Sequence, residues 1–271
     1  MNPEARGRAA AAAFRIDHQL GSQPLGDLVA LIEQTTGIDV AVLDVGPDEH
    51  GLTMRDPVRD AVMIAVAQTQ HPMRQRSTLA HELAHVVFED WTDVPDIASN
   101  SPREQRANAF ARHLLVPGGG IRATMGTGPA SLSQLSKIVQ LFGVSPAIAS
   151  IAMHDEGVIS EDTKREWMPL TTRAVAAQFG WSDHYESLQQ IAYRTRAPQK
   201  LLSRLIEGYV ENVVSLQTIA TVRGHTVDQV MRQLSAENIS PRPRIVTWAN
   251  PGDLPDVETI NWDGEGQDST P

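Results

Sequence analysis

The sequence predicts an α+β fold, in which a small sheet packs against helices and an all-helical region follows toward the C-terminus. Runs rich in β-branched residues occur only in the first third, at 39–45, 52–55 and 61–67, and each is bounded by turn-forming residues. The run 61–67 is apolar on both faces, which is typical of a central, buried strand. From Leu132 to about Ser240 the apolar residues recur with helical spacing, and no strand-like run interrupts them convincingly.

Composition narrows the class of protein. The 271 residues carry a formal net charge of −10 and include no cysteine. Disulfides, thiolate metal sites and cysteine nucleophiles are therefore excluded, so any metal must be held by nitrogen and oxygen ligands. The acidic balance also disfavours a protein whose whole surface binds nucleic acid, although a local basic patch remains compatible with it.

The chain is predicted to be cytoplasmic. Its longest apolar stretch, 61–67, is seven residues long, far below the roughly 20 residues that a membrane-spanning helix needs. The alanine run 9–13 is closely flanked by arginines, and it is too short for the apolar core of a signal peptide, so it is predicted to be helical.

Helices are expected on both sides of the predicted strands. Before them, one helix runs from Pro3 to about Leu20, and a second begins near Leu25 and ends at Gly37. After them, helical periodicity runs from Ser77 to about Glu89, and a further helix runs from Ser101 to Pro117. The segment 118–131 is rich in glycine and is predicted to be a loop.

The helix at 77–89 contains the pattern H-E-x-x-H, formed by His81, Glu82 and His85. Residues four apart lie on the same face of a helix, one turn from each other, so both imidazoles can bind a single ion. Glu82 follows the first histidine and can reach a water molecule at that ion without being a ligand. Zinc lowers the pKa of such a water to about 7, and Glu82 would accept its proton during attack on a peptide carbonyl. The pattern predicts a zinc peptidase with Glu82 as the catalytic base.

A catalytic zinc needs a third protein ligand and one open position. Glu104 is a candidate, 19 residues after His85 and in the first turn of the next helix. The same residue could instead complete a capping box with Ser101, because S-x-x-E at a helix start bonds the backbone of its own first turn. His113 is a rival ligand, about half a helical revolution from Glu104, so one helix cannot easily offer both. Three loop aspartates are weaker alternatives, namely Asp90, Asp93 and Asp96.

The motif and its surroundings resemble the ImmA/IrrE family of metallopeptidases. The resemblance is carried by two stretches, Arg74-x-Arg76-Ser77-Thr78-Leu79-Ala80-His81-Glu82-Leu83-Ala84-His85 and Glu104-x-x-Ala107-Asn108-x-Phe110-Ala111-x-x-Leu114-Leu115-x-Pro117. The family usually has an aromatic residue at position 77, a glycine at 84 and often a methionine at 116. These departures change none of the proposed ligands.

The resemblance covers about residues 1–160 and implies a zincin-like metallopeptidase domain with one zinc ion. It implies that Glu104 is the third ligand, beside His81 and His85. It also implies a regulatory, site-specific cut in a protein partner, a helix-turn-helix repressor or an antitoxin. A helical pair at about 131–160 resembles the helix-turn-helix-like element of family members. Plain core packing explains that pair better, because it carries a single lysine and no arginine.

Three further side chains on the second motif helix are candidates for contacting the substrate or its carbonyl group. They are Asn108, Arg112 and His113. Asn108 lies one turn after Glu104 on the same face, and the other two follow it. A structural role is the simpler explanation for each of them.

The remainder of the chain is predicted to form a helical module at 161–240 and an acidic, proline-rich tail at 241–271. Within the module, Ile219, Ala220, Gly224, Thr226 and Val230 have the spacing of a helix-turn-helix. A helical bundle with a glycine turn explains this spacing at least as well. The alternative to a protease is a DNA-binding or protein-interaction regulator with a structural or vestigial metal site, for which Glu82 would have no use.

Overall fold

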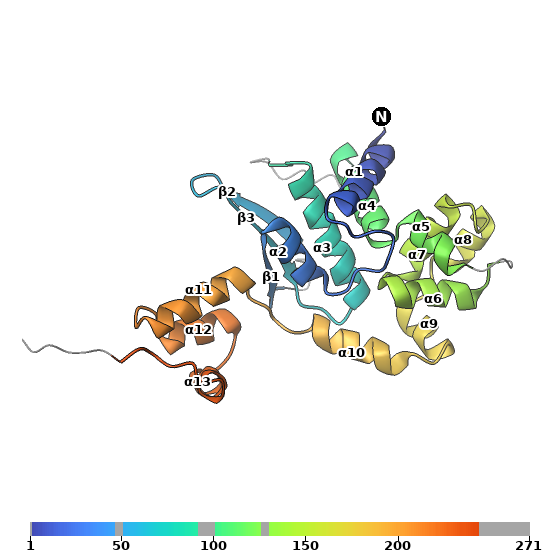
Figure 1. Cartoon of the computed structure of the whole chain (residues 1–271). Helices are drawn as coiled ribbons and strands as arrows, with labels where there is room; N and C mark the ends of the chain where they lie inside the picture. Colours follow the sequence, from blue (N-terminus) through green and yellow to red (C-terminus); the bar gives the residue numbers. More distant parts are fainter. Residues whose placement is uncertain (1, 47–50, 92–100, 126–129, 244–271) are drawn as a thin grey trace, which may run out of the picture.

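The computed structural model describes residues 2–46, 51–91, 101–125 and 130–243 and has the predicted α+β architecture (Figure 1). The N-terminal elements are α1 (Pro3–Asp17), α2 (Leu28–Thr36), β1 (Asp39–Leu43), β2 (Gly51–Asp56), β3 (Ala61–Ala67), α3 (Pro72–Val87) and α4 (Pro102–Leu115). The elements that follow are α5 (Gly118–Thr124), α6 (Leu132–Phe142), α7 (Pro146–Asp155), α8 (Glu161–Trp167), α9 (Thr172–Gln178), α10 (Ser182–Ala192), α11 (Gln199–Val210), α12 (Leu216–Arg223) and α13 (Val227–Ala236).

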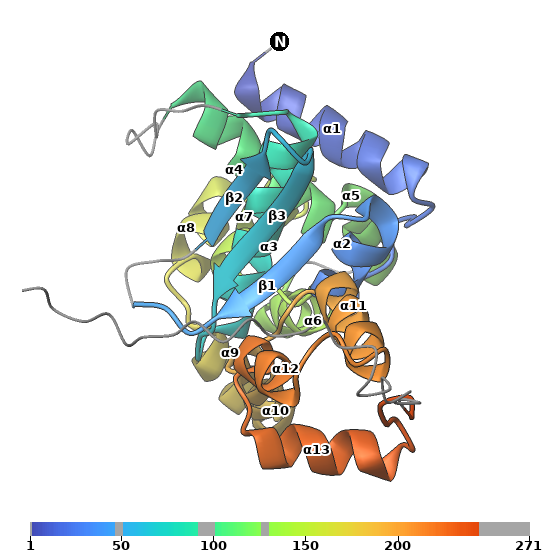
Figure 2. The same ribbon diagram turned by 90° about the vertical axis from the view of Figure 1, so that its left-hand side faces the viewer.

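The three strands form one sheet in the order β1-β3-β2, which confirms that β3 is central. β1 runs parallel to β3, and β2 runs antiparallel to it, with Thr53 opposite Ile64. Ile64 and Val66 are buried because one face of the sheet rests on α3 (Figure 2). β2 is therefore the edge strand nearest the helix that carries the two histidines.

α3 begins five residues before the predicted start because Pro72 occupies its first turn, where the missing N–H costs nothing. Leu79 and Leu83 are buried on one face of the helix, and the alanines that follow them, Ala80 and Ala84, are buried as well. Alanine at these positions lets the sheet and α4 approach the helix closely. The packing fixes the rotation of α3 and hence the direction of its polar face.

α1 lies along α4 (Figure 1) and fixes its position. A Cβ atom on Gly7 would lie 2.4 Å from the carbonyl oxygen of Arg106, so only glycine permits this approach of the two helices. At the other end, the buried guanidinium of Arg15 donates two hydrogen bonds to the carbonyl oxygen of Leu114. Burial lowers the pKa of Arg15 to about 10, which leaves it charged at neutral pH. These contacts hold the helix that carries Glu104.

The predicted loop at 118–131 is wrong over its first half, which forms α5. Glycine disfavours a helix by its flexibility, but here the close packing of α5 favours it. Ile121 is fully buried, and a Cβ on Gly120 would lie 2.6 Å from the Phe142 ring. Tertiary packing therefore overrides the low helix propensity of three consecutive glycines. Residues 126–129 lie outside the described part of the chain.

The hydrophobic core continues beyond residue 160. Its buried members extend through Trp167, Val175 and Trp181 to Tyr185 on α10. A second, separate cluster joins α11, α12 and α13. The predicted division into 1–160 and 161–240 stays a prediction, while the packing places the change of core between α10 and α11. The predicted tail lies outside the described residues from 244 onward.

Polar contacts hold the segment before α11 against the sheet. Arg196 exchanges two backbone hydrogen bonds with Val42 of β1, at 2.8 and 2.9 Å. The buried carboxylate of Glu33 accepts a hydrogen bond of 2.9 Å from the backbone N–H of Gln199, in the first turn of α11. These bonds cover the free edge of β1 and connect the two hydrophobic cores.

In the described part of the chain, no single helix is long and apolar enough to cross a membrane. Taken together, α6 and α7 are long and apolar enough to cross a membrane, but the pair is bent by 109° at the break between the two helices.

Candidate metal centre

His81 and His85 lie on the polar face of α3, one turn apart, and direct the same ring nitrogen toward a common point. Their Nε2 atoms are 3.1 Å apart. The His85 side chain is 10% exposed and that of His81 is 20% exposed, so both are largely shielded from solvent but remain accessible.

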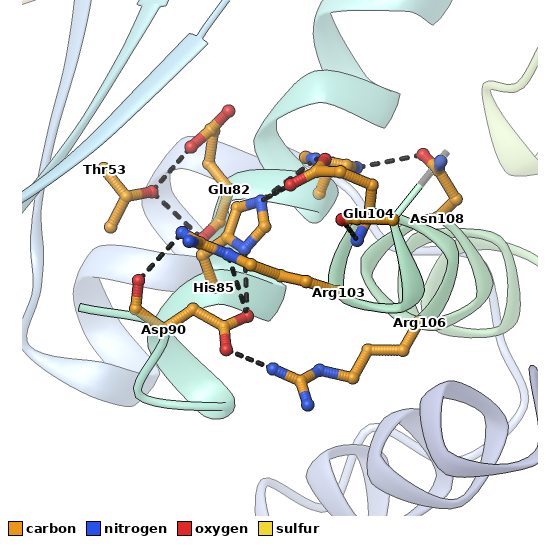
Figure 3. Close-up of polar contacts among 10 residues, drawn as sticks. Thr53, Glu82, His85, Asp90, Arg103, Glu104, Arg106 and Asn108 are labelled. Atoms are coloured by element: carbon orange, nitrogen blue, oxygen red, sulfur yellow. Dashed lines mark hydrogen bonds and ion pairs between the residues drawn. The ribbon is translucent and has the colours of Figure 1, made fainter. Parts of the chain in front are cut away.

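Glu104 reaches the same point from the first turn of α4. One carboxylate oxygen lies 3.0 Å from His81 Nε2 and the other lies 3.6 Å from His85 Nε2. Ser101 Oγ accepts a hydrogen bond of 3.3 Å from the backbone N–H of Glu104, which is the serine half of the predicted capping box. The carboxylate of Glu104 points at the histidines (Figure 3).

The other ring nitrogen of each histidine is held by a polar side chain. His81 Nδ1 lies 3.0 Å from Asn108 Oδ1, and His85 Nδ1 lies 3.1 Å from Asp90 Oδ2. An oxygen acceptor at Nδ1 favours the tautomer with its proton there, which leaves the Nε2 lone pair directed at the shared point. Asn108 therefore supports His81 through its side-chain oxygen, and its predicted contact with a substrate carbonyl stays a prediction.

Asp90 is a buried carboxylate at the centre of an ionic network below His85 (Figure 3). It pairs with the guanidinium groups of Arg106 and Arg103, both from α4. It follows Glu89, whose positive φ of 52° turns the chain back toward the helix end. Asp90 thus connects His85 on α3 to the helix that carries Glu104. Its position supports a histidine, and it does not belong to the three converging donor groups.

Glu82 is nearly buried, and its carboxylate lies on the side of α3 that faces β2. Thr53 Oγ1 donates to Glu82 Oε2 at 2.7 Å and lies 3.1 Å from the Glu82 carbonyl oxygen. A Cβ on Gly51 would lie 2.7 Å from Glu82 Oε1, so glycine allows the edge strand to pass directly over this carboxylate. The edge strand therefore fixes the orientation of the Glu82 carboxylate against β2.

The three converging groups match the donor set and spacing of a zinc site. Two imidazoles and one carboxylate are a common ligand set for catalytic zinc. With bonds of about 2.0–2.1 Å, neighbouring ligands of a tetrahedral ion are about 3.3 Å apart. The observed separations of 3.0, 3.1 and 3.6 Å bracket this value. The residues present thus fit a single small divalent cation.

His113 and Arg112 lie away from the three converging groups, and their predicted contact with the substrate stays a prediction. His113 Nε2 is 2.9 Å from Glu4 of α1, and Arg112 pairs with both Glu4 and Asp155. Helical rotation explains the outcome, because these residues face α1 while Glu104 faces α3. Asp93 and Asp96 fall outside the described residues.

Sequence patterns gave no signal for Thr53. It occurs in a short predicted strand 29 residues before Glu82, and only the pairing of that strand with β3 brings it over α3. Asp90 had a weak signal, since an acidic residue soon after a ligand histidine is a common supporting partner. The sequence alone predicts Asp90 only as a direct ligand.

A helix with two histidines, a carboxylate from the next helix and a small sheet above them together define a zincin-like metallopeptidase domain. Residues 33–154 match the Peptidase_M78 family, the IrrE N-terminal-like domain. This stretch of the chain is therefore similar to the ImmA/IrrE family of metallopeptidases, which is in general zinc-dependent.

No curated protein matches the chain. Among solved structures, a Mycobacterium tuberculosis transcriptional regulator matches at 20% identity with a TM-score of 0.38, covering 59% of this chain and 49% of that protein. The chain thus spans about half the length of that regulator. A likeness this weak says nothing about the activity of this chain.

Proposed function

We propose that the protein is a zinc-dependent endopeptidase, in which His81, His85 and Glu104 hold the metal and Glu82 is the catalytic base. The observation that carries the proposal is the convergence of three donor groups from two helices. The carboxylate of Glu82, the residue next to His81, is held separately by Thr53. A purely structural metal site would need the three ligands but would have no use for Glu82. The match of residues 33–154 to the Peptidase_M78 family supports the same conclusion.

Zinc bound at this site would supply a Lewis acid that activates water and polarises a peptide carbonyl. Glu82 accepts a proton from the attacking water while the new C–O bond forms. The same carboxylic acid then donates that proton to the departing amine nitrogen as the C–N bond breaks. Thr53 keeps one oxygen of Glu82 hydrogen-bonded, which restricts the rotation of the carboxylate and leaves its second oxygen to take the proton.

The proposed substrate is a protein partner of regulatory type, a helix-turn-helix repressor or an antitoxin, cut at a specific site. Support for this class comes from the regulatory character of the ImmA/IrrE family. A single cut between the DNA-binding and dimerisation parts of a repressor would abolish its function, so slow, selective hydrolysis would suffice for regulation.

The proposal is tested with Glu82→Gln, which preserves shape and removes the base. We expect this variant to retain one zinc per chain and to lose about 10²–10⁴-fold in hydrolysis rate. Because it binds without cutting, it should retain the natural substrate from cell extract, which mass spectrometry would identify. The zinc-loaded wild type should then cut the purified captured protein at one site.

Two results would contradict the proposal. One is cleavage of the captured protein by Glu82→Gln at the wild-type rate. The other is the absence of any new N-terminus after incubation with the zinc-loaded wild type, which would favour the alternative of a regulator with a vestigial metal site.

A further inference from the structure

The segment α12–α13 folds as the helix-turn-helix that its residue spacing allows. Ala220 is 1% exposed and packs where the two helices cross, Gly224 ends α12 in the left-handed region with φ +63°, and Val230 is 1% exposed. Thr226 then opens α13 with a capping box formed with Gln229. Each position of the pattern thus has the structural role that a helix-turn-helix requires.

α11 completes a compact three-helix unit around this pair. Its small core consists of Ile219, Ala220, Val230 and Leu234, with Leu205, Ile206 and Tyr209 of α11 packed against it. The bonds of Glu33 and Arg196 described above tie the unit to the sheet. α13 lies at the periphery of the molecule, away from the sheet (Figures 1 and 2).

α13 is a nearly free helix. Only Val230 and Leu234 are buried, and the remaining side chains of the helix are exposed or partly exposed. The other helix-turn-helix-like pair, α6–α7, differs in this respect because Ala149, Ala152 and Met153 of its second helix lie in the main core. Of the two pairs, α12–α13 is the one whose second helix can enter a groove.

The unit does not share the negative charge of the rest of the chain. From Gln199 to Ala236 it contains four lysines and arginines against three aspartates and glutamates, whereas the whole chain has a net charge of −10. Among the basic residues, Lys200, Arg204 and Arg232 are exposed. A module without net negative charge is the part of an acidic protein that can approach phosphates.

We propose that α11–α13 binds duplex DNA, with α13 as the recognition helix in the major groove. The first two turns of α13 expose Asp228, Gln229 and Arg232. Acidic side chains accept from cytosine N4 and arginine pairs with guanine, so Asp228 and Arg232 can read base edges. The Gln229 side chain is held by the capping box at the start of the helix. The DNA site is separate from the metal centre and does not depend on the proposed peptidase activity.

The test begins with selection of bound duplexes from a library with a random 20-base-pair core, using the full-length protein. Fluorescence anisotropy then compares the enriched duplex with a shuffled duplex of the same composition at several salt concentrations. We expect enrichment of one sequence, preferred at least tenfold over the shuffled duplex. Affinity should fall as salt rises, since phosphate contacts release counterions.

Arg232→Ala should weaken binding to the enriched duplex by about 5- to 100-fold. The matched control is Arg165→Ala on α8, an exposed arginine paired with Asp162, which should bind within twofold of wild type. Glu82→Gln should also bind DNA normally, which separates this site from the peptidase. The proposal is overturned if no sequence is enriched, or if Arg232→Ala binds the enriched duplex as tightly as wild type does.

Discussion

Two clusters of histidine and carboxylate groups occupy opposite faces of α4, and both bring their ligand atoms within 4.8 Å of one another. One consists of His81, His85 and Glu104. The other consists of Glu4, His113 and Asp155. The spacing of the ligand atoms alone does not distinguish the two clusters. They differ in where the neighbouring charged side chains lie and in whether other side chains hold the histidines in place.

In the first cluster, the arginines of the described part of the chain do not contact the three donor groups directly. Arg103 and Arg106 pair with Asp90, which in turn holds His85. The three donor groups therefore face one another without an intervening cation, and each histidine has its second nitrogen fixed. Such a site is organised for a metal ion.

In the second cluster, the basic group lies between the carboxylates. Arg112 pairs with Glu4 and with Asp155, and Glu4 also accepts from His113. The positive charge that a metal would supply is already provided by the guanidinium. Residue types and distances identify a candidate metal site. The position of neighbouring arginines then distinguishes a metal site from a salt bridge.

The largest effect is expected for His81→Ala, with His113→Ala as its matched control. Removal of a ligand should lower zinc affinity by more than the roughly 10- to 100-fold that loss of a supporting residue costs. His113→Ala should still bind one zinc per chain, since the second cluster is a salt bridge. Chelator competition on both variants measures this. If both variants lost zinc affinity equally, the two clusters could not be told apart as a metal site and a salt bridge.

A smaller effect is expected for Asp90→Asn, which leaves His85 an acceptor but removes the charge that pairs with Arg106. Zinc affinity should fall about 10- to 100-fold. Asp155→Asn in the second cluster is the control and should leave zinc affinity unchanged. If Asp90→Asn binds zinc as tightly as wild type does, the buried network has no part in organising the metal centre.

Thr53→Val tests the edge strand's contact with Glu82. The substitution keeps the shape and removes the hydroxyl that donates to Oε2. Loss of one hydrogen bond to a charged group should lower kcat by about tenfold, with KM and zinc affinity held. Thr53→Ser should restore kcat, because it restores the donor. A fall in zinc affinity instead would place Thr53 in the support of the ligands.

The smallest effect concerns the pH dependence of folding stability at the second cluster. Burial lowers the pKa of His113 below its ordinary value of 6.5, and its hydrogen bond with Glu4 offsets this only in part. The folded state therefore favours the neutral His113 ring. Its contribution to the free energy of unfolding is fully present above pH 6.5 and is lost as the pH falls below that value.

Urea unfolding at pH 7.5 and 5.5 measures that contribution. His113→Gln keeps a donor for Glu4 and does not titrate, so its stability should fall less than that of wild type over this interval. An identical fall in both proteins would show that His113 titrates as freely in the folded chain as in the unfolded chain.

Much of the fold could be predicted from local sequence. The apolar run 61–67 predicted the central strand, and Gly37 marked the end of α2 because it adopts the positive φ that glycine favours. α1 ends at Asp17, three residues before its predicted end. The glycine-rich start of α5 was missed, since its helix depends on packing against Phe142, which is distant in sequence.

The candidate site divides in the same way. His81, Glu82 and His85 could be found because helical spacing alone places them together. Glu104 needed the family resemblance, because its capping role was an equal alternative. Thr53 and the supporting role of Asp90 depend on strand pairing and on the packing of α4, which no local pattern encodes.

The central claim is that one zinc ion binds between α3 and α4. Anomalous diffraction at the zinc edge, from crystals of the full chain prepared with one equivalent of zinc, tests it most directly. The account predicts one peak, bounded by the Nε2 atoms of His81 and His85 and the carboxylate of Glu104. A peak beside Glu4, His113 and Asp155, or none between the two helices, would contradict it.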